Sequence, residues 1–66
     1  MLGKPKYKKG DTLLFRLGNK FHKGSVFVVD EWGTFGQNLQ VSYDLQSEEN
    51  ILYKHIRESQ IIDKIS

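Results

Sequence analysis

A chain of 66 residues without cysteine and with a net charge of +2 is expected to form one small domain. Such a domain has too small a core to enclose a large ligand, and the lack of cysteine excludes a disulfide scaffold, thiol catalysis and cysteine-ligated metals. No apolar run approaches the ~20 residues of a membrane-spanning helix, and the first residues lack the apolar stretch of a signal peptide, so we expect a soluble, cytoplasmic protein.

Positive charge is concentrated at the start of the chain. Residues 1–24 contain seven Lys or Arg and one acid, whereas the remaining residues contain three basic and seven acidic side chains. We expect residues 1–9 to form a basic flexible arm in front of a single β-barrel domain over residues 10–66. The arm could bind phosphates through its lysines, or it could serve only solubility and protection of a sheet edge.

The first strand is expected over residues 12–17, after a turn at Gly10 and Asp11. Alternation would point Leu13, Phe15 and Leu17 inward. Residues 18–24 are expected to be a polar loop bounded by glycines, with Gly18 and Asn19 as the candidates for positive φ. His22 lies in this loop, where a single histidine is more often a surface residue than a metal ligand.

A central hairpin is expected from residue 24 to residue 45, with a turn over residues 33–36. Its outgoing arm contains the continuous apolar run 26–29, which is typical of a long strand that bends and buries both faces. Its return arm alternates strictly, which is typical of a strand buried on one face. The inward residues would be Leu39, Val41, Tyr43 and Leu45, and the outward residues Gln40, Ser42, Asp44 and Gln46.

The last part of the chain predicts an acidic turn over residues 46–50, a short fourth strand over 51–54, one helical turn over 55–59 and a closing strand over 60–65. These elements describe an all-β fold, a small five-stranded SH3-like barrel with one short 3-10 turn before the last strand. Pairing of the first and last strands would protect their edges. The predicted core consists of Leu13, Phe15, Val26, Val29, Val41, Tyr43, Ile51, Ile56 and Ile61.

Several short segments carry a resemblance to a known group: residues 9–11, 24–30, 33–35, 42–45 and 52–56, with Glu58. Together they resemble short uncharacterised proteins of Gram-positive bacteria, their phages and mobile elements, which are Src-homology-3-like small barrels. The resemblance implies a barrel fold and a bacterial host cell. It brings no catalytic or binding residues to carry over.

Residue patterns for catalysis are lacking, and we expect a protein that is not an enzyme and needs no cofactor. The neighbouring acids Asp30 and Glu31, like Glu48 and Glu49, would point to opposite faces of a strand, whereas an acid/base pair must converge on one substrate. No serine lies in a nucleophile elbow, and no phosphate loop or dinucleotide fingerprint is present. Two histidines without paired spacing make a metal site improbable.

Aromatic side chains are more numerous than so small a core requires, so some are expected to bind a ligand. An exposed ring beside basic donors suits a nucleobase and its phosphate. The candidate ligand-binding residues are Trp32, Phe35, Tyr43, Tyr53, Lys54, His55 and Arg57. Alternatively, Tyr43 and Tyr53 are core partners on neighbouring strands, and Arg57 pairs with Glu58 or Asp63.

Two functions of different class remain open. The first is a non-catalytic, phage-type accessory protein that sequesters a nucleotide-derived signal or a host defence protein. The second is a small barrel that binds RNA or DNA through the basic arm and first loop, using Lys4, Lys6, Lys8, Lys9, Arg16, Lys20 and Lys23. The acidic remainder of the chain argues against the second.

Self-association is expected, because a monomer of this size has no room for a buried pocket, so a ligand would lie on an open face, in a loop cleft or between subunits. A symmetric partner could cover the open sheet edge and the apolar turn, and it would bring two copies of Tyr53, His55 and Arg57 near one another.

Overall fold

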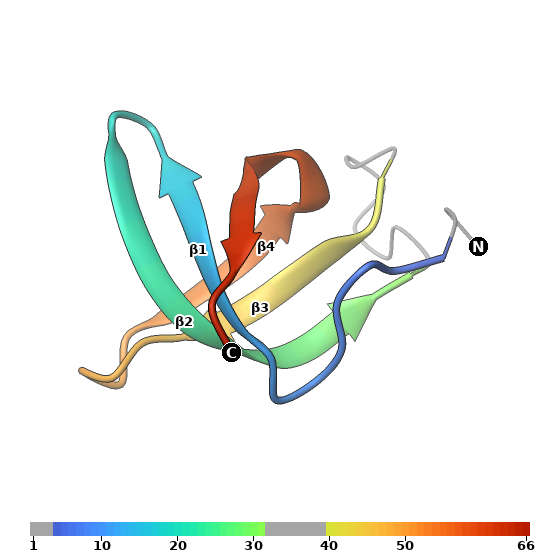
Figure 1. Ribbon diagram of the computed structural model, residues 1–66, viewed down its shortest axis with the longest axis horizontal. Helices are drawn as coiled ribbons and strands as arrows, with labels where there is room; N and C mark the ends of the chain where they lie inside the picture. Colours follow the sequence, from blue (N-terminus) through green and yellow to red (C-terminus); the bar gives the residue numbers. More distant parts are fainter. Residues whose placement is uncertain (1–3, 32–39) are drawn as a thin grey trace.

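The computed structural model describes residues 4–31 and 40–66, in which five antiparallel strands form one sheet of order β4-β3-β2-β1-β5 (Figure 1). The elements are β1 (Thr12–Leu17), β2 (Lys20–Asp30), β3 (Ser42–Gln46), β4 (Leu52–Arg57), the 3-10 helix η1 (Glu58–Gln60) and β5 (Ile61–Lys64). The expected fold class, a small five-stranded barrel with one 3-10 turn before the last strand, is confirmed. The predicted turn over 33–36 lies outside the described residues, as do Trp32, Phe35 and Leu39.

Strand β2 begins five residues earlier than predicted. The predicted loop over 18–24 is wrong beyond Gly18 and Asn19, because the residues from Lys20 onward pair with β1, for example Phe15 with His22. Gly18 has the expected positive φ of 63°, but Asn19 does not share it. Positive φ at only the first of two turn residues is what a type II′ hairpin requires. The polar side chains of this segment hid the strand from sequence patterning.

Strand β4 extends beyond its predicted end to Arg57, so the helical turn expected over 55–59 begins only at Glu58. The cause is a β-bulge, because Tyr43 pairs with Ile56 and Leu45 with Tyr53, which leaves two residues opposite Asp44. One of them, His55, has a φ of 59°, and its N–H donates to Asp44 Oδ1 at 3.0 Å. The extra residue interrupts the alternation on which a strand prediction depends.

Seven hydrophobic side chains form the buried core: Leu13, Phe15, Val26, Val41, Tyr43, Leu45 and Ile56. Val29 and Ile61 are partly buried and pack against it. The predicted core position of Ile51 is wrong, since Ile51 is 47% exposed and lies in the turn that projects beyond the core. Leu17 was expected to face inward but is 39% exposed at the tip of the β1–β2 hairpin, and Ser42, expected outside, is buried between β2 and β4.

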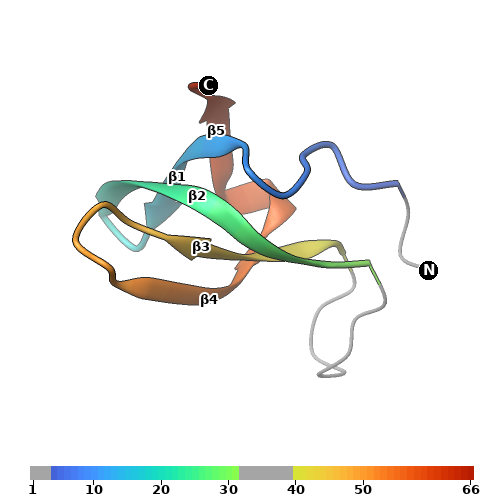
Figure 2. The same ribbon diagram turned by 90° about the horizontal axis from the view of Figure 1, so that it is seen from below.

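The first and last strands pair as predicted, with Phe15 opposite Ile61. Thr12 extends this pairing beyond β5, because its carbonyl accepts from the Ile65 N–H at 2.7 Å and its N–H donates to Ser66 O at 2.6 Å. Figure 2 shows β2, β3 and β4 side by side on one flank, with η1 leading into β5 and the C-terminus on the other. Pairing with β1 therefore joins the end of the chain to the sheet, in which β4 and β5 are the two outer strands.

The described part of the N-terminal segment contacts the barrel through backbone N–H groups and through the side chains of Tyr7 and Lys9. The ring of Tyr7 packs edge-on against Tyr43 with centroids 5.8 Å apart. The Lys6 N–H donates to Glu58 Oε2 at 3.2 Å, and the Lys8 N–H donates to Asp11 Oδ2 at 3.0 Å. The flexibility of the arm stays a prediction.

Over the ranges that the structure describes, no helix has the length and apolar character to cross a membrane.

Candidate functional site

A groove of about 410 Å³ lies between the β1–β2 hairpin and the segment from the end of β4 through η1 into β5. The hairpin contributes Arg16, Gly18 and Phe21, and the later segment contributes Arg57, Ser59, Gln60 and Ile62. We call this hollow the arginine groove. It joins two parts of the chain that are far apart in sequence, because β5 pairs with β1 and thereby brings η1 beside the hairpin.

Gln60 holds the two arginine-bearing segments together. Its Oε1 accepts from the Arg57 N–H at 2.9 Å, and its Nε2 donates to Arg16 O at 3.1 Å. One amide side chain thus bridges the backbones of β1 and β4. The backbone positions of Arg16 and Arg57 are therefore held relative to each other by the fold.

The charge in the arginine groove is uncompensated. No acidic residue lines it, and within residues 4–31 and 40–66 neither Arg16 nor Arg57 forms an ion pair. The pairing of Arg57 with Glu58 or Asp63, considered from sequence, does not occur. Glu58 instead accepts from the Tyr43 hydroxyl and the Lys6 N–H. Arg16 uses Nε to donate to Gly18 O at 2.9 Å, which orients its guanidinium.

Two apolar side chains flank these cations. Phe21, paired with Arg16 across the hairpin, is 61% exposed, and Ile62 of β5 is 50% exposed. An exposed ring beside a guanidinium can stack on a flat ligand while the guanidinium binds an anion. The arginine groove therefore combines an anion-binding part with an apolar part.

The structure does not gather the predicted ligand-binding residues into one site. Tyr43 is fully buried, and its hydroxyl donates to Glu58 Oε2 at 2.6 Å. Tyr53 is half-buried against Phe15 and His22, with ring centroids 5.3 and 5.0 Å away. The suggestion that both tyrosines are core partners fits these positions better. Lys54 and His55 are exposed on β4 outside the arginine groove, so of the described members of this set only Arg57 lines it.

The basic residues expected to bind nucleic acid are also dispersed. In Figures 1 and 2 the described part of the N-terminal arm and the tip of the β1–β2 hairpin, where β2 begins at Lys20, lie at opposite ends of the molecule. Arg16 lines the arginine groove, whereas Lys23 lines a different hollow. Along the described chain these side chains therefore do not share one continuous face.

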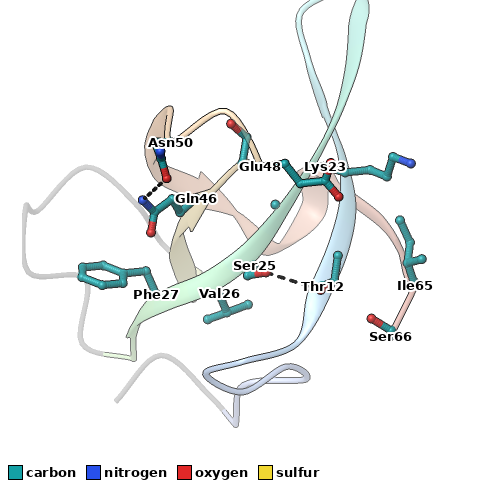
Figure 3. Close-up of a pocket in the computed structure, with 12 residues that line it drawn as sticks. Thr12, Lys23, Ser25, Val26, Phe27, Gln46, Glu48, Asn50, Ile65 and Ser66 are labelled. Atoms are coloured by element: carbon teal, nitrogen blue, oxygen red, sulfur yellow. Dashed lines mark hydrogen bonds between the residues drawn. The ribbon is translucent and has the colours of Figure 1, made fainter.

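That second hollow, of about 500 Å³, is shown in Figure 3. It carries one cation, Lys23, and one acid, Glu48. Several of its polar groups bond to each other, with Gln46 Nε2 donating to Asn50 Oδ1 at 3.4 Å and the hydroxyls of Thr12 and Ser25 also 3.4 Å apart. Balanced charge and paired polar groups make it less suited than the arginine groove to an ionic ligand.

Sequence reasoning missed Phe21, Ser59 and Gln60, and it grouped Arg16 only with the nucleic-acid residues. One signal could have found Phe21. A two-residue turn at Gly18 and Asn19 places Arg16 directly opposite Phe21, as the register shows. Nothing local indicates Gln60, because its role depends on contacts with β1.

No cluster of three or more metal-ligating side chains occurs in the part of the chain that the structure describes.

Comparisons with models of protein families, with curated proteins and with solved structures find no match for this chain. The expected kinship with small barrels of bacteria and phages stays a prediction, and function has to be inferred from the geometry of the arginine groove.

Proposed function

We propose that this is a non-catalytic binding protein that holds a phosphorylated, nucleotide-like ligand in the arginine groove. One observation carries the proposal: two guanidiniums without carboxylate partners lie with an exposed aromatic ring in a groove that no acid lines.

Anion binding follows from the chemistry of the two cations. A guanidinium presents a planar fork of donors that matches the oxygens of a phosphate, and the resulting hydrogen bonds are charge-assisted. Each such bond contributes roughly 1.5–3 kcal/mol, and the open groove favours the lower end of that range because solvent screens the charges. Since neither arginine of the groove has to give up an ion pair first, this energy is available to a ligand.

The organic part of the ligand would lie on Phe21. Stacking of a base on an aromatic ring contributes about 1–3 kcal/mol, and the ring of Phe21 is exposed enough to accept it. The groove volume of about 410 Å³ lies within the roughly 300–1,000 Å³ of typical small-molecule sites. A mononucleotide is therefore a better match than a long polymer.

Binding without reaction is supported by what lines the groove. Within the described chain, Ser59 is the one lining residue with a nucleophilic side chain, and neither a histidine nor a carboxylate lines the groove to act on its proton. Arginine does not serve as a general base, because it stays protonated. The lining is thus equipped to hold an anion, which is what sequestration requires.

Calorimetric titration with ATP as the probe tests the proposal. We expect Arg16→Ala and Arg57→Ala each to weaken binding by about tenfold, which corresponds to one lost charge-assisted contact. Lys64→Gln is the matched control, because it removes one positive charge at an ion pair with Asp11 outside the arginine groove. Its affinity should equal that of the unmodified protein at a temperature where both are folded.

Two results would contradict the proposal. A double variant of Arg16 and Arg57 that retains full affinity would place the ligand elsewhere. Tight binding of a single-stranded oligonucleotide, with a steep salt dependence that flattens when Lys6, Lys8 and Lys9 are changed to Ala, would identify the arm as the functional surface instead.

A further inference from the structure

The arginine groove is rich in hydrogen-bond donors and poor in available acceptors. Guanidinium groups donate hydrogen bonds and cannot accept them. Of the donors on Arg16, Nε is used within the hairpin, on Gly18 O, and no intramolecular ion pair involves Arg57 in the described ranges. Among the lining residues that the structure describes, Ser59 supplies the one hydroxyl.

Apart from the Ser59 hydroxyl, the side-chain acceptor of the groove and the Gly18 carbonyl each already accept one hydrogen bond. Gln60 Oε1 accepts from the Arg57 N–H, and Gln60 Nε2 donates to Arg16 O. Gly18 O accepts from Arg16. Among residues 4–31 and 40–66, Gln60 is the only amide side chain that lines the groove, and both of its polar atoms already bond to the backbone.

Identifying a base requires a specific pattern of donors and acceptors opposite its edge, whereas binding a phosphate chain requires donors alone. The apolar part of the groove adds little discrimination between one nucleobase and another. Phe21 and Ile62 offer exposed apolar surface, and stacking on an aromatic ring tolerates every base because each has a π face.

The number of cations sets the preferred number of phosphates. Two guanidiniums that each pair with two oxygens use four acceptor positions, whereas a terminal phosphate presents three oxygens, so both forks fit one phosphate only by sharing an oxygen. A chain of two or three phosphates can reach both. Gln60 keeps the backbones of Arg16 and Arg57 joined, so both cations stay available to the same chain of phosphates.

We propose that the arginine groove selects its ligand by the phosphate chain and not by the base, so that its ligand class is the nucleoside di- and triphosphates irrespective of base. This inference rests on the proposed function and specifies its ligand.

A titration series at fixed ionic strength without divalent cations tests the inference. The probes are ATP, GTP, CTP and UTP, then ADP, AMP and adenosine, and finally inorganic diphosphate. We expect the four triphosphates to bind within about threefold of one another, since stacking is the only base-dependent contact. Affinity should fall by about tenfold from ADP to AMP, when one guanidinium loses its phosphate, and adenosine should not bind measurably.

Two variants measure separately how much the aromatic ring and the arginine fork contribute to affinity. Phe21→Leu keeps an apolar side chain but removes the ring, so it should weaken all four triphosphates by the same factor and leave binding of inorganic diphosphate unchanged. Arg16→Lys keeps the charge but loses the fork, so it should reduce affinity for ATP and for inorganic diphosphate alike.

The outcomes distinguish this inference from the proposed function. A preference of about tenfold or more for one base, or equal affinity for AMP and ATP, overturns the selection by phosphate chain and leaves nucleotide binding intact. A protein that binds none of these probes overturns the proposed function itself. Binding that ignores the replacement of both Arg16 and Arg57 overturns both.

Discussion

Tyr43 shows at the scale of one residue how burial changes a role expected from sequence. Its ring lies in the core, its hydroxyl donates to Glu58 Oε2 and accepts from the Tyr7 N–H at 3.4 Å, and Glu58 also accepts from the Lys6 N–H. Burial, together with the bond to Glu58, raises the pKa of Tyr43 well above its ordinary value. This residue connects the N-terminal segment, β3 and η1, so its role is structural.

Changing Tyr43 to Phe should lower the free energy of unfolding by roughly 1–2 kcal/mol at neutral pH, because a buried hydrogen bond is lost. It should also change the response to alkali. Since the folded protein holds the tyrosine proton more tightly than the unfolded chain, this contribution is complete below the ordinary tyrosine pKa of 10.0 and is lost as the pH rises above it.

Urea denaturation of both proteins at neutral pH and above pH 10.0 measures these effects. The stability of the unmodified protein should decline more steeply in alkali than that of the Phe variant, since other titrating groups are common to both. Parallel curves would show that ionisation of this hydroxyl is not coupled to folding.

At the scale of elements, β2 determines how the barrel bends. Its first part pairs with β1 and its second part with β3, and an irregularity of register falls between Val26 and Val28. Gly24 lies where the pairing changes over. A Cβ built on Gly24 would approach Leu45 Cβ to 3.1 Å and Gln46 O to 3.2 Å, so a side chain here fits only if β3 gives way by a few tenths of an ångström.

Changing Gly24 to Ala should therefore destabilise the fold by about 1–3 kcal/mol, because the added methyl group forces the two strands apart. For a domain of this size that corresponds to a fall in Tm of roughly 4–8 °C per kcal/mol. Ser25→Ala is the control, since the neighbouring Ser25 is exposed. If thermal unfolding finds the same Tm for Gly24→Ala as for the control, the close crossing is not a constraint.

At the scale of the whole molecule, the seven core side chains of the described residues are too few to enclose a ligand as well. A nucleotide in the arginine groove would remain partly in water. Strands β4 and β5 end the sheet, and each has one edge without a partner strand in it. Such edges invite pairing with another chain. A second copy that covers an edge near the groove would enclose the ligand further.

We therefore expect light scattering to report a dimer or larger species, and we expect ATP to raise its Tm, because a ligand that binds only the folded assembly stabilises it by mass action. Arg57→Ala should reduce that shift in Tm. A protein that stays monomeric at high micromolar concentration and still binds ATP fully would rule out a site shared between subunits.

Local patterning determined much of this fold from sequence alone. The bounds of β1, the inward positions of Tyr43 and Leu45 and the single turn before the last strand all follow from alternation and turn residues, which are properties of neighbouring residues. The same signal failed where a strand carries polar side chains, as from Lys20 to Lys23, and where a bulge interrupts alternation, as at His55.

The arginine groove was decided only by the tertiary structure. Arg16 and Arg57 were assigned from sequence to two different hypothetical sites, because nothing in their neighbourhoods relates one to the other. They line one groove because β5 pairs with β1 and because Gln60 bonds to both backbones, and such contacts between distant segments exist only once the barrel has closed.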